Sequence, residues 1–520
     1  MTGLLPNARK MQVLQAPGPS PRSALDKLDH VIIITPASIP ARLWKTLPDG
    51  SRLQQLSRRA ASDQVLHSRL QNHAATGVSF GRLPKTESRG TLPAPFELLG
   101  FAGKLVADAL RDSPRSLGIL PAGLPDDVAE AVAHAFVLAA AAHSFQMPDY
   151  RSEGKKPSEL TTLKLLGLPT RIELDRTLTE ADAANLARWL TQMPPNKLST
   201  ASYRKILRNL AKAHGWKMEF LGEARLRKLG AGAFLAVSQG NATRDAGIVR
   251  LRYTPSQTPG KKNQPALALV GKGIIFDTGG TNLKPFKSML DMHEDMGGSA
   301  IAVATLQALT EVGYPFPVDC WLAITENRLS AEAYKSRDIV TASNGTTIEV
   351  IHTDAEGRMA LADALALAGR EKPGLMIDFA TLTGACYGAL SPRYSGVFTN
   401  RQALNAVLID AGIASGERVW PFPMDADFDT DLKSNVADIV QCSPSGEADH
   451  ILASRFLARF VPKESPWIHV DLSAVNRKGG LAQMPSGVTG FGVRFTMNLL
   501  LDQADAMRAV IGNSAPVSSL

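Results

Sequence analysis

Cysteine is scarce in this chain, and long apolar runs are missing from it. Its 520 residues include only three cysteines, Cys320, Cys386 and Cys442, whose separations match no metal-binding spacing. This scarcity excludes a disulfide-stapled secreted domain and favours a reduced, cytoplasmic setting. No apolar run reaches the ~18 residues of a membrane span, and the first residues show no secretory signal pattern. We therefore expect a cytoplasmic protein that does not enter the membrane.

Strong one-sided charge is confined to the beginning of the chain. The net charge is +8, and residues 1–100 hold 13 Lys and Arg against 6 Asp and Glu, which gives 13 − 6 = +7 and leaves +1 for the rest. Such a basic region could attract nucleic acid. The basic residues are dispersed, without a Lys/Arg run or an aromatic platform, so an ordinary solvated surface is the favoured interpretation. DNA binding stays open as an alternative.

The length predicts at least two domains, because one hydrophobic core does not grow to this size. A segment rich in Pro, Ser and Gly, residues 1–29, is expected to be poorly ordered. Apolar strands and helical patterns then alternate and predict a small α/β domain over 30–165. Its predicted strands are 30–39 and 116–123, and its predicted helices are 50–72, 100–112 and 126–145. A helix within 166–195, stopped by Pro194-Pro195, is the expected linker.

The rest of the chain, 196–510, predicts a larger α/β domain with a mixed, mostly parallel sheet covered by helices on both faces. The strand candidates are 265–277, 317–325, 346–353, 374–383 and 467–475. Helical patterns lie between them, including 297–313 and 358–370. In such sheets, functional sites gather at the carboxyl ends of the strands.

Charged residues appear where these apolar runs stop. Lys272 lies inside the 265–277 strand, Asp277 ends it, and Lys284 follows. A buried lysine is unusual because desolvation disfavours its charged form, and binding a metal as a neutral amine is one solution. Asp295 precedes the next helix. The pair Asp354 and Glu356 stands at the mouth of another helix, with Arg358 directly behind.

Four carboxylates in one place would repel one another unless cations lay between them. Oxygen ligands with one amine suit Zn²⁺, Mn²⁺, Co²⁺ or Mg²⁺. Two such ions ~3.5–4 Å apart activate water and polarise a carbonyl or phosphoryl oxygen, which predicts a hydrolase. Taken singly, the acids could favour helix starts or turns, and the lysines could be surface charges. The combination favours the metal site.

Five segments resemble the successive motifs of the leucyl (cytosol) aminopeptidase family of two-metal zinc or manganese peptidases. They are GKGIIFDTGGTNLKP (271–285), DMHEDMGGSA (291–300), TENRLSAEAYKSRDIV (325–340), HTDAEGRMALADAL (352–365) and ATLTGA (380–385). The fourth segment is the most specific. The resemblance runs from about Asn196 to Leu500, and the N-terminal domain resembles the family only in size and α/β pattern.

The resemblance implies a role for each charged residue. Lys272, Asp277, Asp295 and Glu356 would hold the tighter metal, while Asp277, Glu356 and Asp354 would hold the more exchangeable one. Lys284 would hydrogen-bond the scissile carbonyl and its developing oxyanion. Arg358 would hold a bicarbonate ion that acts as general base.

The resemblance also implies an apolar pocket for the first residue of the substrate. Met292, Thr381, Leu382 and Gly384 would line it and give a broad preference for residues such as Leu and Met. Plain core packing is the alternative for these four residues.

The implied activity is release of N-terminal residues from peptides through attack by a metal-bridging hydroxide. The implied assembly is a homohexamer, a dimer of trimers. A different di-metal amidase or phosphatase remains an alternative, against which the absence of a phosphate-cradling glycine loop counts.

Two departures from the family pattern stand out. His352 occupies a position where the family has Asn, and it could change hydrogen bonding around the metal ligands or, less favourably, act as an extra ligand. The segment GEADHILASRFLARF (446–460) replaces the small residues expected at a helix start. We expect that segment to alter the rim of the cleft or a subunit contact.

Overall fold

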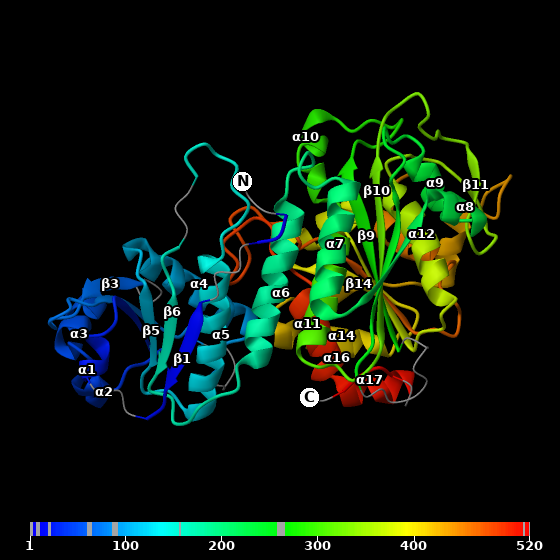
Figure 1. Ribbon diagram of the computed structural model, residues 1–520. Helices are drawn as coiled ribbons and strands as arrows, with labels where there is room; N and C mark the ends of the chain where they lie inside the picture. Colours follow the sequence, from blue (N-terminus) through cyan, green and yellow to red (C-terminus); the bar gives the residue numbers. More distant parts are fainter. Residues whose placement is uncertain are drawn as a thin grey trace. The chain divides into compact units, whose positions relative to one another are not determined.

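The computed structural model describes residues 4–6, 11–18, 22–59, 65–85, 92–154, 158–256, 266–512 and 515–518. The chain forms two compact units, each shown in Figure 1. The N-terminal unit comprises Met1–Asn185 with Lys478–Gly487, and the larger unit comprises Leu186–Arg477 with Val488–Leu520. Among the described residues, no helix combines the length and apolar character needed to cross a membrane.

The N-terminal unit is built on a six-stranded sheet of order β1-β6-β5-β2-β4-β3, parallel except at the β3–β4 pair. The strands are β1 (Gln12–Ala16), β2 (His30–Thr35), β3 (Leu66–Arg69), β4 (Gly77–Arg82), β5 (Ser116–Pro121) and β6 (Thr162–Leu166). Strand β2 is buried along its whole length, as its β-branched composition predicts.

Helices cover both faces of this sheet. One apolar core lies between the sheet and helices α4 (Pro95–Ala109) and α5 (Asp126–Ser144). A second core on the opposite face includes residues of α1 (Arg22–Leu25) and α3 (Gly50–Arg59), with residues of α2 (Ala41–Thr46) packed against it. The predicted α/β architecture of this unit is confirmed.

Several local expectations differ from the structure. Segment 1–29 was expected to be poorly ordered, but it contains strand β1. This strand forms because its backbone pairs with the distant β6. Strand β3 falls within the predicted helix 50–72, of which residues 60–64 lie outside the described part. Strands β4 and β6 were not predicted. Each of these strands depends on a partner remote in sequence, so local pattern alone does not specify it.

The larger unit contains an eight-stranded mixed sheet of order β15-β14-β17-β13-β9-β10-β8-β7. Its centre, β17-β13-β9-β10, is parallel, and antiparallel pairs flank it on both sides. The strands are β7 (Lys217–Gly222), β8 (Gly247–Tyr253), β9 (Leu267–Asp277), β10 (Val318–Asn327), β13 (Leu375–Ala380), β14 (Ser395–Thr399), β15 (Val419–Pro421) and β17 (Trp467–Asp471).

Helices pack on both faces of this sheet (Figure 1). Helix α12 (Glu356–Gly369) lies on β9 and β10, with α9 (Gly232–Ser238) and α15 (Asp449–Ala458) beside it. Helix α11 (Gly297–Glu311) lies on β9, β10 and β13, and it contacts α16 (Val493–Leu501). The remaining helices are α6 (Asp175–Gln192), α7 (Thr200–His214), α8 (Glu223–Lys228), α10 (Phe286–Met289), α13 (Gly384–Leu390), α14 (Leu404–Ser415) and α17 (Ala504–Ile511). Short 3-10 helices span Leu110–Asp112, Met292–Glu294, Ser391–Arg393 and Ala426–Leu432.

Strand β9 sends alternate side chains to these two helix layers. A Cβ added at Gly271 would lie 2.5 Å from the Cα of Ser299, so only glycine lets α11 approach this closely. The next residue, Lys272, points to the other face, where its Nζ would lie 2.6 Å from a Cβ at Gly357 of α12. The period-2 geometry of the strand therefore aims the buried lysine at the start of α12.

The strand predicted over 346–353 does not join the main sheet. Only β12 (Thr347–Glu349) forms there, in a separate three-stranded sheet between β11 (Ile339–Thr341) and β16 (Ile439–Val440). The following residues form a loop that ends at Glu356, the first residue of α12. The expectation that Asp354 and Glu356 follow a strand of the main sheet is therefore wrong.

Each unit contains a fully buried polar side chain that is paired with other polar groups of the same unit. Asp319 in β10 is fully buried and pairs with Arg250 at 2.7 Å and with Arg252 at 2.6 Å, both from β8. His30 in β2 is also fully buried, with Nε2 2.8 Å from the hydroxyl oxygen of Ser79. Burial lowers the pKa of His30 from 6.5 to about 4.

Candidate metal centre and active site

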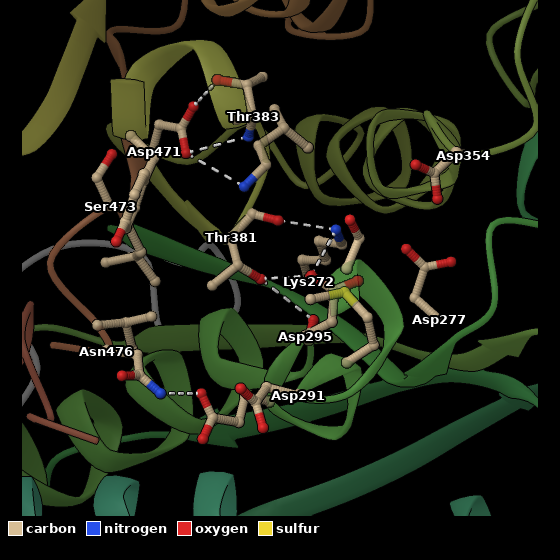
Figure 2. A pocket seen from close by; sticks show the side chains of 18 of the residues that line it. Lys272, Asp277, Asp291, Asp295, Asp354, Thr381, Thr383, Asp471, Ser473 and Asn476 are labelled. Carbon is tan, nitrogen blue, oxygen red and sulfur yellow. Dashed lines mark hydrogen bonds and ion pairs between the residues drawn. The ribbon is translucent and has the colours of Figure 1, made fainter. Parts of the chain in front are cut away.

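A cleft of about 560 Å³ in the larger unit brings together six charged side chains that the sequence singled out (Figure 2). They come from β9, the loop after it, the start of α11 and the segment leading into α12. These side chains are Lys272, Asp277, Lys284, Asp295, Asp354 and Glu356.

Lys272 is the centre of an ion-pair network at the base of the cleft. Its Nζ lies 2.8 Å from Oδ1 of Asp295 and 3.0 Å from Oε1 of Glu356, and it donates a hydrogen bond to the carbonyl of Thr381. Burial alone would lower the pKa of Lys272, but the surrounding carboxylates outweigh burial and raise it above the ordinary lysine value. The position of Lys272 is thus set by acids from two helix starts.

Asp277 and Lys284 face each other across a tight turn. Oδ1 of Asp277 accepts hydrogen bonds from the backbone N–H of Gly279 and the side-chain amide of Asn327, both at 2.8 Å. The turn passes through Gly279 and Gly280 at φ of +87° and +64°, a conformation that favours glycine. It returns the chain so that Nζ of Lys284 lies 2.9 Å from Oδ2 of Asp277.

Lys284 also contacts the acid ahead of α12. Its Nζ lies 2.5 Å from Oδ1 of Asp354. Burial would lower the pKa of Lys284, and the nearby carboxylates raise it above its usual range. This lysine is therefore a positive charge held at the edge of a carboxylate cluster.

The carboxylates are close enough to share cations. Ligand oxygens of Asp277, Asp354 and Glu356 all lie within 4.8 Å of one another. Burial, together with neighbouring acids, raises the pKa of Glu356 to about 8 and that of Asp295 to about 6. A group of acids this crowded is unfavourable when all its members are ionised, and a few hydrogen bonds and the two lysines offset only part of the repulsion.

Two buried oxygens test whether metal ions fit this site. Among the described residues, neither Oδ2 of Asp295 nor Oε2 of Glu356 has a hydrogen-bond partner. A buried oxygen without a partner carries a desolvation cost, and a divalent cation would supply the missing partner and reduce the repulsion. Carboxylate oxygens with one amine are suitable ligands for such a cation. The donor set therefore fits divalent metal ions.

The helix-start explanation for Glu356 accounts for only part of its environment. Glu356 is the first residue of α12, where the helix dipole favours a negative charge. Its carboxylate, however, contacts Lys272 and is almost fully buried. A residue that only stabilised the helix start could remain exposed. The buried contact with Lys272 therefore indicates that Glu356 belongs to the charged cluster of the cleft.

Arg358 lies behind the cleft rather than in its lining. Its side chain is 2% exposed, and its Nη2 donates to both carboxylate oxygens of Asp449, at 2.7 and 2.8 Å. Its Nη1 donates to the carbonyl of Gln441 at 3.3 Å. Asp449 was not predicted as a site residue, although it lies in the 446–460 segment that departs from the family pattern.

His352 lies beside a predicted ligand. Its Nδ1 is 3.3 Å from the backbone nitrogen of Asp354, and its own backbone N–H donates to the side chain of Gln441. The carboxylate cluster around Asp277 does not include this histidine. The geometry favours an influence on the Asp354 loop over direct ligation.

The four predicted pocket residues, Met292, Thr381, Leu382 and Gly384, all line the cleft. Thr381 also donates its hydroxyl to Oδ1 of Asp295 at 2.7 Å. Its position is therefore tied to that of a proposed ligand.

Polar residues that the sequence did not single out line the same cleft. Asp291, Glu294, Ser473 and Asn476 are among them, and the side-chain amide of Asn476 donates to Glu294. Figure 2 shows Asn476 and Ser473 on the side of the cleft away from Asp277. Burial raises the pKa of Glu294 to about 7. Glu294 stands inside a quoted motif, directly before Asp295, so its position offered a signal that was missed.

Asp471, at the end of β17, fixes the turn that carries part of the cleft. It is almost fully buried and accepts hydrogen bonds from the backbone of Leu382 at 3.1 Å and the hydroxyl of Thr383 at 2.6 Å. These contacts hold the passage from β13 into α13 (Figure 2). A buried acid at the end of a predicted strand was available in the sequence as a signal.

Comparison with known proteins places this geometry in a family. The protein-family model described as "Cytosol aminopeptidase family, catalytic domain" matches residues 185–497 of this chain. A "Probable cytosol aminopeptidase" of Syntrophotalea carbinolica is 38% identical over 399 residues, which cover 74% of this chain and 77% of that protein. The protein of the same name from Corynebacterium diphtheriae is 37% identical over 382 residues, covering 71% and 75%.

Solved structures agree over nearly the whole chain. A mutant of tomato leucine aminopeptidase superposes with a TM-score of 0.81 at 28% identity, covering 95% of this chain and 98% of that one. The bottromycin maturation enzyme BotP in complex with Mn gives a TM-score of 0.77 at 30% identity, covering 92% and 100%. Together with the site geometry, these matches show that the chain belongs to the cytosol aminopeptidase family and is a metal-dependent hydrolase that releases N-terminal residues from peptides.

Proposed function

We propose that two divalent cations, Zn²⁺ or Mn²⁺, bind in the cleft and that five side chains hold them. Lys272, Asp277, Asp295 and Glu356 would hold one ion, and Asp277, Asp354 and Glu356 the other. The observation that carries this proposal is the crowded carboxylate cluster with two buried oxygens lacking partners. Bound metals of this kind activate water and polarise the scissile carbonyl. Support for manganese comes from the Mn complex of BotP.

Lys284 is the proposed catalytic cation of the chain itself. Its Nζ lies at the edge of the cluster, 2.9 Å from Asp277 and 2.5 Å from Asp354, and it lines the cleft. A substrate carbonyl entering there would accept a hydrogen bond from Lys284. The same ammonium would stabilise the negative charge that develops on that oxygen during attack.

The proposed metal centre would select substrates with a free α-amino group. That group, as a neutral amine, would bind one of the two proposed cations through its lone pair, and a peptide carries an α-amine only at its N-terminus. The reacting bond is then the first peptide bond of the substrate. This restriction separates an aminopeptidase from a general amidase.

The first side chain of the substrate would occupy the part of the cleft near Met292 and Leu382. These apolar residues support the expected acceptance of Leu and Met. The Glu294–Asn476 pair makes another part of the wall polar. We propose a broad preference that also includes side chains with a polar or basic end.

Bicarbonate, which the resemblance implies, does not fit the groups around Arg358. Nη2 of Arg358 already donates hydrogen bonds to both carboxylate oxygens of Asp449. The Asp449 carboxylate thus occupies the place that bicarbonate would take, and it would repel an added anion. No step of the proposed reaction uses bicarbonate.

The proposed assembly and location rest on the family resemblance alone. We propose a homohexamer, a dimer of trimers, because the family resemblance implies it. We also propose a cytoplasmic location, in line with the names of the relatives. Light scattering on the eluted protein would measure the number of subunits.

Hydrolysis of Leu-p-nitroanilide tests the proposed function. The rate is measured on purified protein, after metal stripping, and after addition of Mn²⁺ or Zn²⁺, with N-acetyl-Leu-p-nitroanilide as the matched substrate. Activity that disappears and returns with metal, and that requires the free amine, supports the proposal. Equal cleavage of the acetylated substrate would indicate a different amidase. A folded, metal-loaded protein without activity on either substrate would overturn the proposal.

A further inference from the structure

The guanidinium of Arg358 is buried, charged and already paired within its own chain. Its exposed fraction is 2%, and a charge in that position needs a partner to offset its lost hydration. Asp449 supplies one through two short contacts, 2.7 and 2.8 Å, to a single guanidinium nitrogen. Hydrogen bonds between ionised groups are stronger than neutral ones, especially away from water.

The carboxylate comes from a separate element that packs against α12. Asp449 is the first residue of α15, and α15 contacts α12, the helix that carries both Glu356 and Arg358. The residue before it, Ala448, adopts a left-handed conformation at φ of +50°, which is unfavourable for a non-glycine residue. The backbone thus adopts an unfavourable angle at Ala448, the residue directly before the Asp449 carboxylate that pairs with Arg358.

The remaining donors of Arg358 leave little for another anion. Nη1 donates to the carbonyl of Gln441 at 3.3 Å. Nε is the one nitrogen without a partner among the described residues. A single buried donor next to the Asp449 carboxylate offers a weak site for an added anion, because the two negative charges would repel each other.

We propose that Asp449 is the built-in anionic partner of Arg358 and makes this enzyme independent of dissolved bicarbonate. This inference rests on the proposed function and concerns one property of the same site. Asp449 is a positioning residue, since it acts through Arg358, which stands two residues from Glu356 on α12. An anion that belongs to the chain cannot dissociate, so Arg358 stays paired whatever the dissolved carbonate concentration.

The wild-type enzyme provides the first test. Its hydrolysis of Leu-p-nitroanilide is measured in carbonate-free buffer and during a titration with bicarbonate. We expect no change in kcat or KM across the titration. In parallel, ¹³C-bicarbonate observed by NMR should show no binding to the metal-free protein. Activation of the wild type by bicarbonate, or clear binding in the NMR experiment, would overturn the proposal.

The variant Asp449→Ala provides the second test. Removing the carboxylate should lower kcat by ~10²-fold, as misplacement of a positioned group does. It should also create a binding site for a small anion. Bicarbonate, formate or acetate should then restore much of the activity, and ¹³C-bicarbonate should bind to Asp449→Ala. A purely structural ion pair would lose activity and stability together, without rescue by added anions.

Asp429→Ala is the matched control. Asp429 pairs with Arg455, also on α15, through contacts of 2.6 and 2.7 Å, but it does not contact Arg358. This variant should lose some stability and show no response of its activity to bicarbonate. If bicarbonate raised the activity of Asp429→Ala and Asp449→Ala equally, the response would be a general salt effect, and the proposal would be rejected.

Misfolding of Asp449→Ala and inactivity of the wild type can each be distinguished from failure of this proposal. If Asp449→Ala does not fold, as judged by circular dichroism, the wild-type titration and the NMR measurement still decide the proposal. If wild-type protein does not cleave Leu-p-nitroanilide at all, the proposed function fails, while the ¹³C experiment still shows whether Arg358 is available to bicarbonate.

Discussion

The substitution Gly357→Ala tests whether the site depends on the position of Lys272. A Cβ at this position would lie 2.5 Å from Cε, 2.6 Å from Nζ and 2.9 Å from Cδ of Lys272. Ordinary contacts between such atoms are about 3.5–4.0 Å, so the lysine end must move by roughly 1 Å. The atoms it meets belong to the end of a flexible side chain, and the backbone can stay in place. Nζ of Lys272 would then leave its position beside Asp295 and Glu356.

The expected loss is catalytic rather than structural. A misplacement of about 1 Å at a positioned group costs roughly 10²-fold in rate. Alanine has a higher helix propensity than glycine by up to about 1 kcal/mol, so the melting temperature should not fall much. We therefore expect kcat/KM on Leu-p-nitroanilide to drop ~10²-fold, with weaker retention of the metal ion that Lys272 is proposed to coordinate.

The assay compares three proteins by activity, metal content and thermal unfolding. The control is Gly388→Ala in α13, where an added Cβ has nothing within 4 Å. That variant should keep full activity and metal content. If Gly357→Ala also retained both, the position of Lys272 would not matter for metal binding, and the ligand assignment would be refuted.

Three other changes address separate parts of the chain. Lys284→Ala should lower kcat by ~10²–10³-fold with a smaller effect on KM, because the lost hydrogen bond strengthens as the oxyanion forms; an unchanged kcat would contradict this role. Asp319→Ala should cost about 3–5 kcal/mol of unfolding free energy in urea, because it leaves its two arginines without their buried partner; a cost near zero would show that solvent screens the pair. His30 has a folded pKa of about 4 against an ordinary 6.5, so its contribution is full above pH 6.5 and is lost as pH falls toward 4. That contribution amounts to about 3 kcal/mol, and His30→Asn should flatten the pH dependence of unfolding across this window. An equal slope in the variant would contradict the shifted pKa.

Several elements could be predicted from the sequence because their signals are local. The apolar, β-branched run ending at Asp277 predicts β9, and the observed strand is Leu267–Asp277. The Ala-rich pattern behind Glu356 predicts α12, which begins at that residue. Side chains within a few residues of each other suffice for these predictions, since strand and helix periodicities depend on nearest neighbours.

Other features depend on contacts that no local pattern specifies. The strand candidate 346–353 pairs with β11 and β16 in a separate sheet, since hydrogen bonding to remote partners decides which sheet a short strand joins. The ion pair between Arg358 and Asp449 joins residues 91 positions apart. The polar Glu294–Asn476 pair likewise joins distant segments, 182 positions apart, so the pairing could not be predicted, although the place of Glu294 beside Asp295 was a usable signal.

The sequence by itself determined which chemical groups this protein possesses: four carboxylates, two lysines and an arginine in motifs that predict a two-metal peptidase. Only the tertiary structure decided how they are paired. Lys272 reaches Asp295 and Glu356 because β9 alternates its side chains between two helix layers. Arg358 meets a carboxylate of its own chain because α15 packs against α12. Residue types are written locally, whereas charge pairing depends on distances of a few ångströms that folding alone creates.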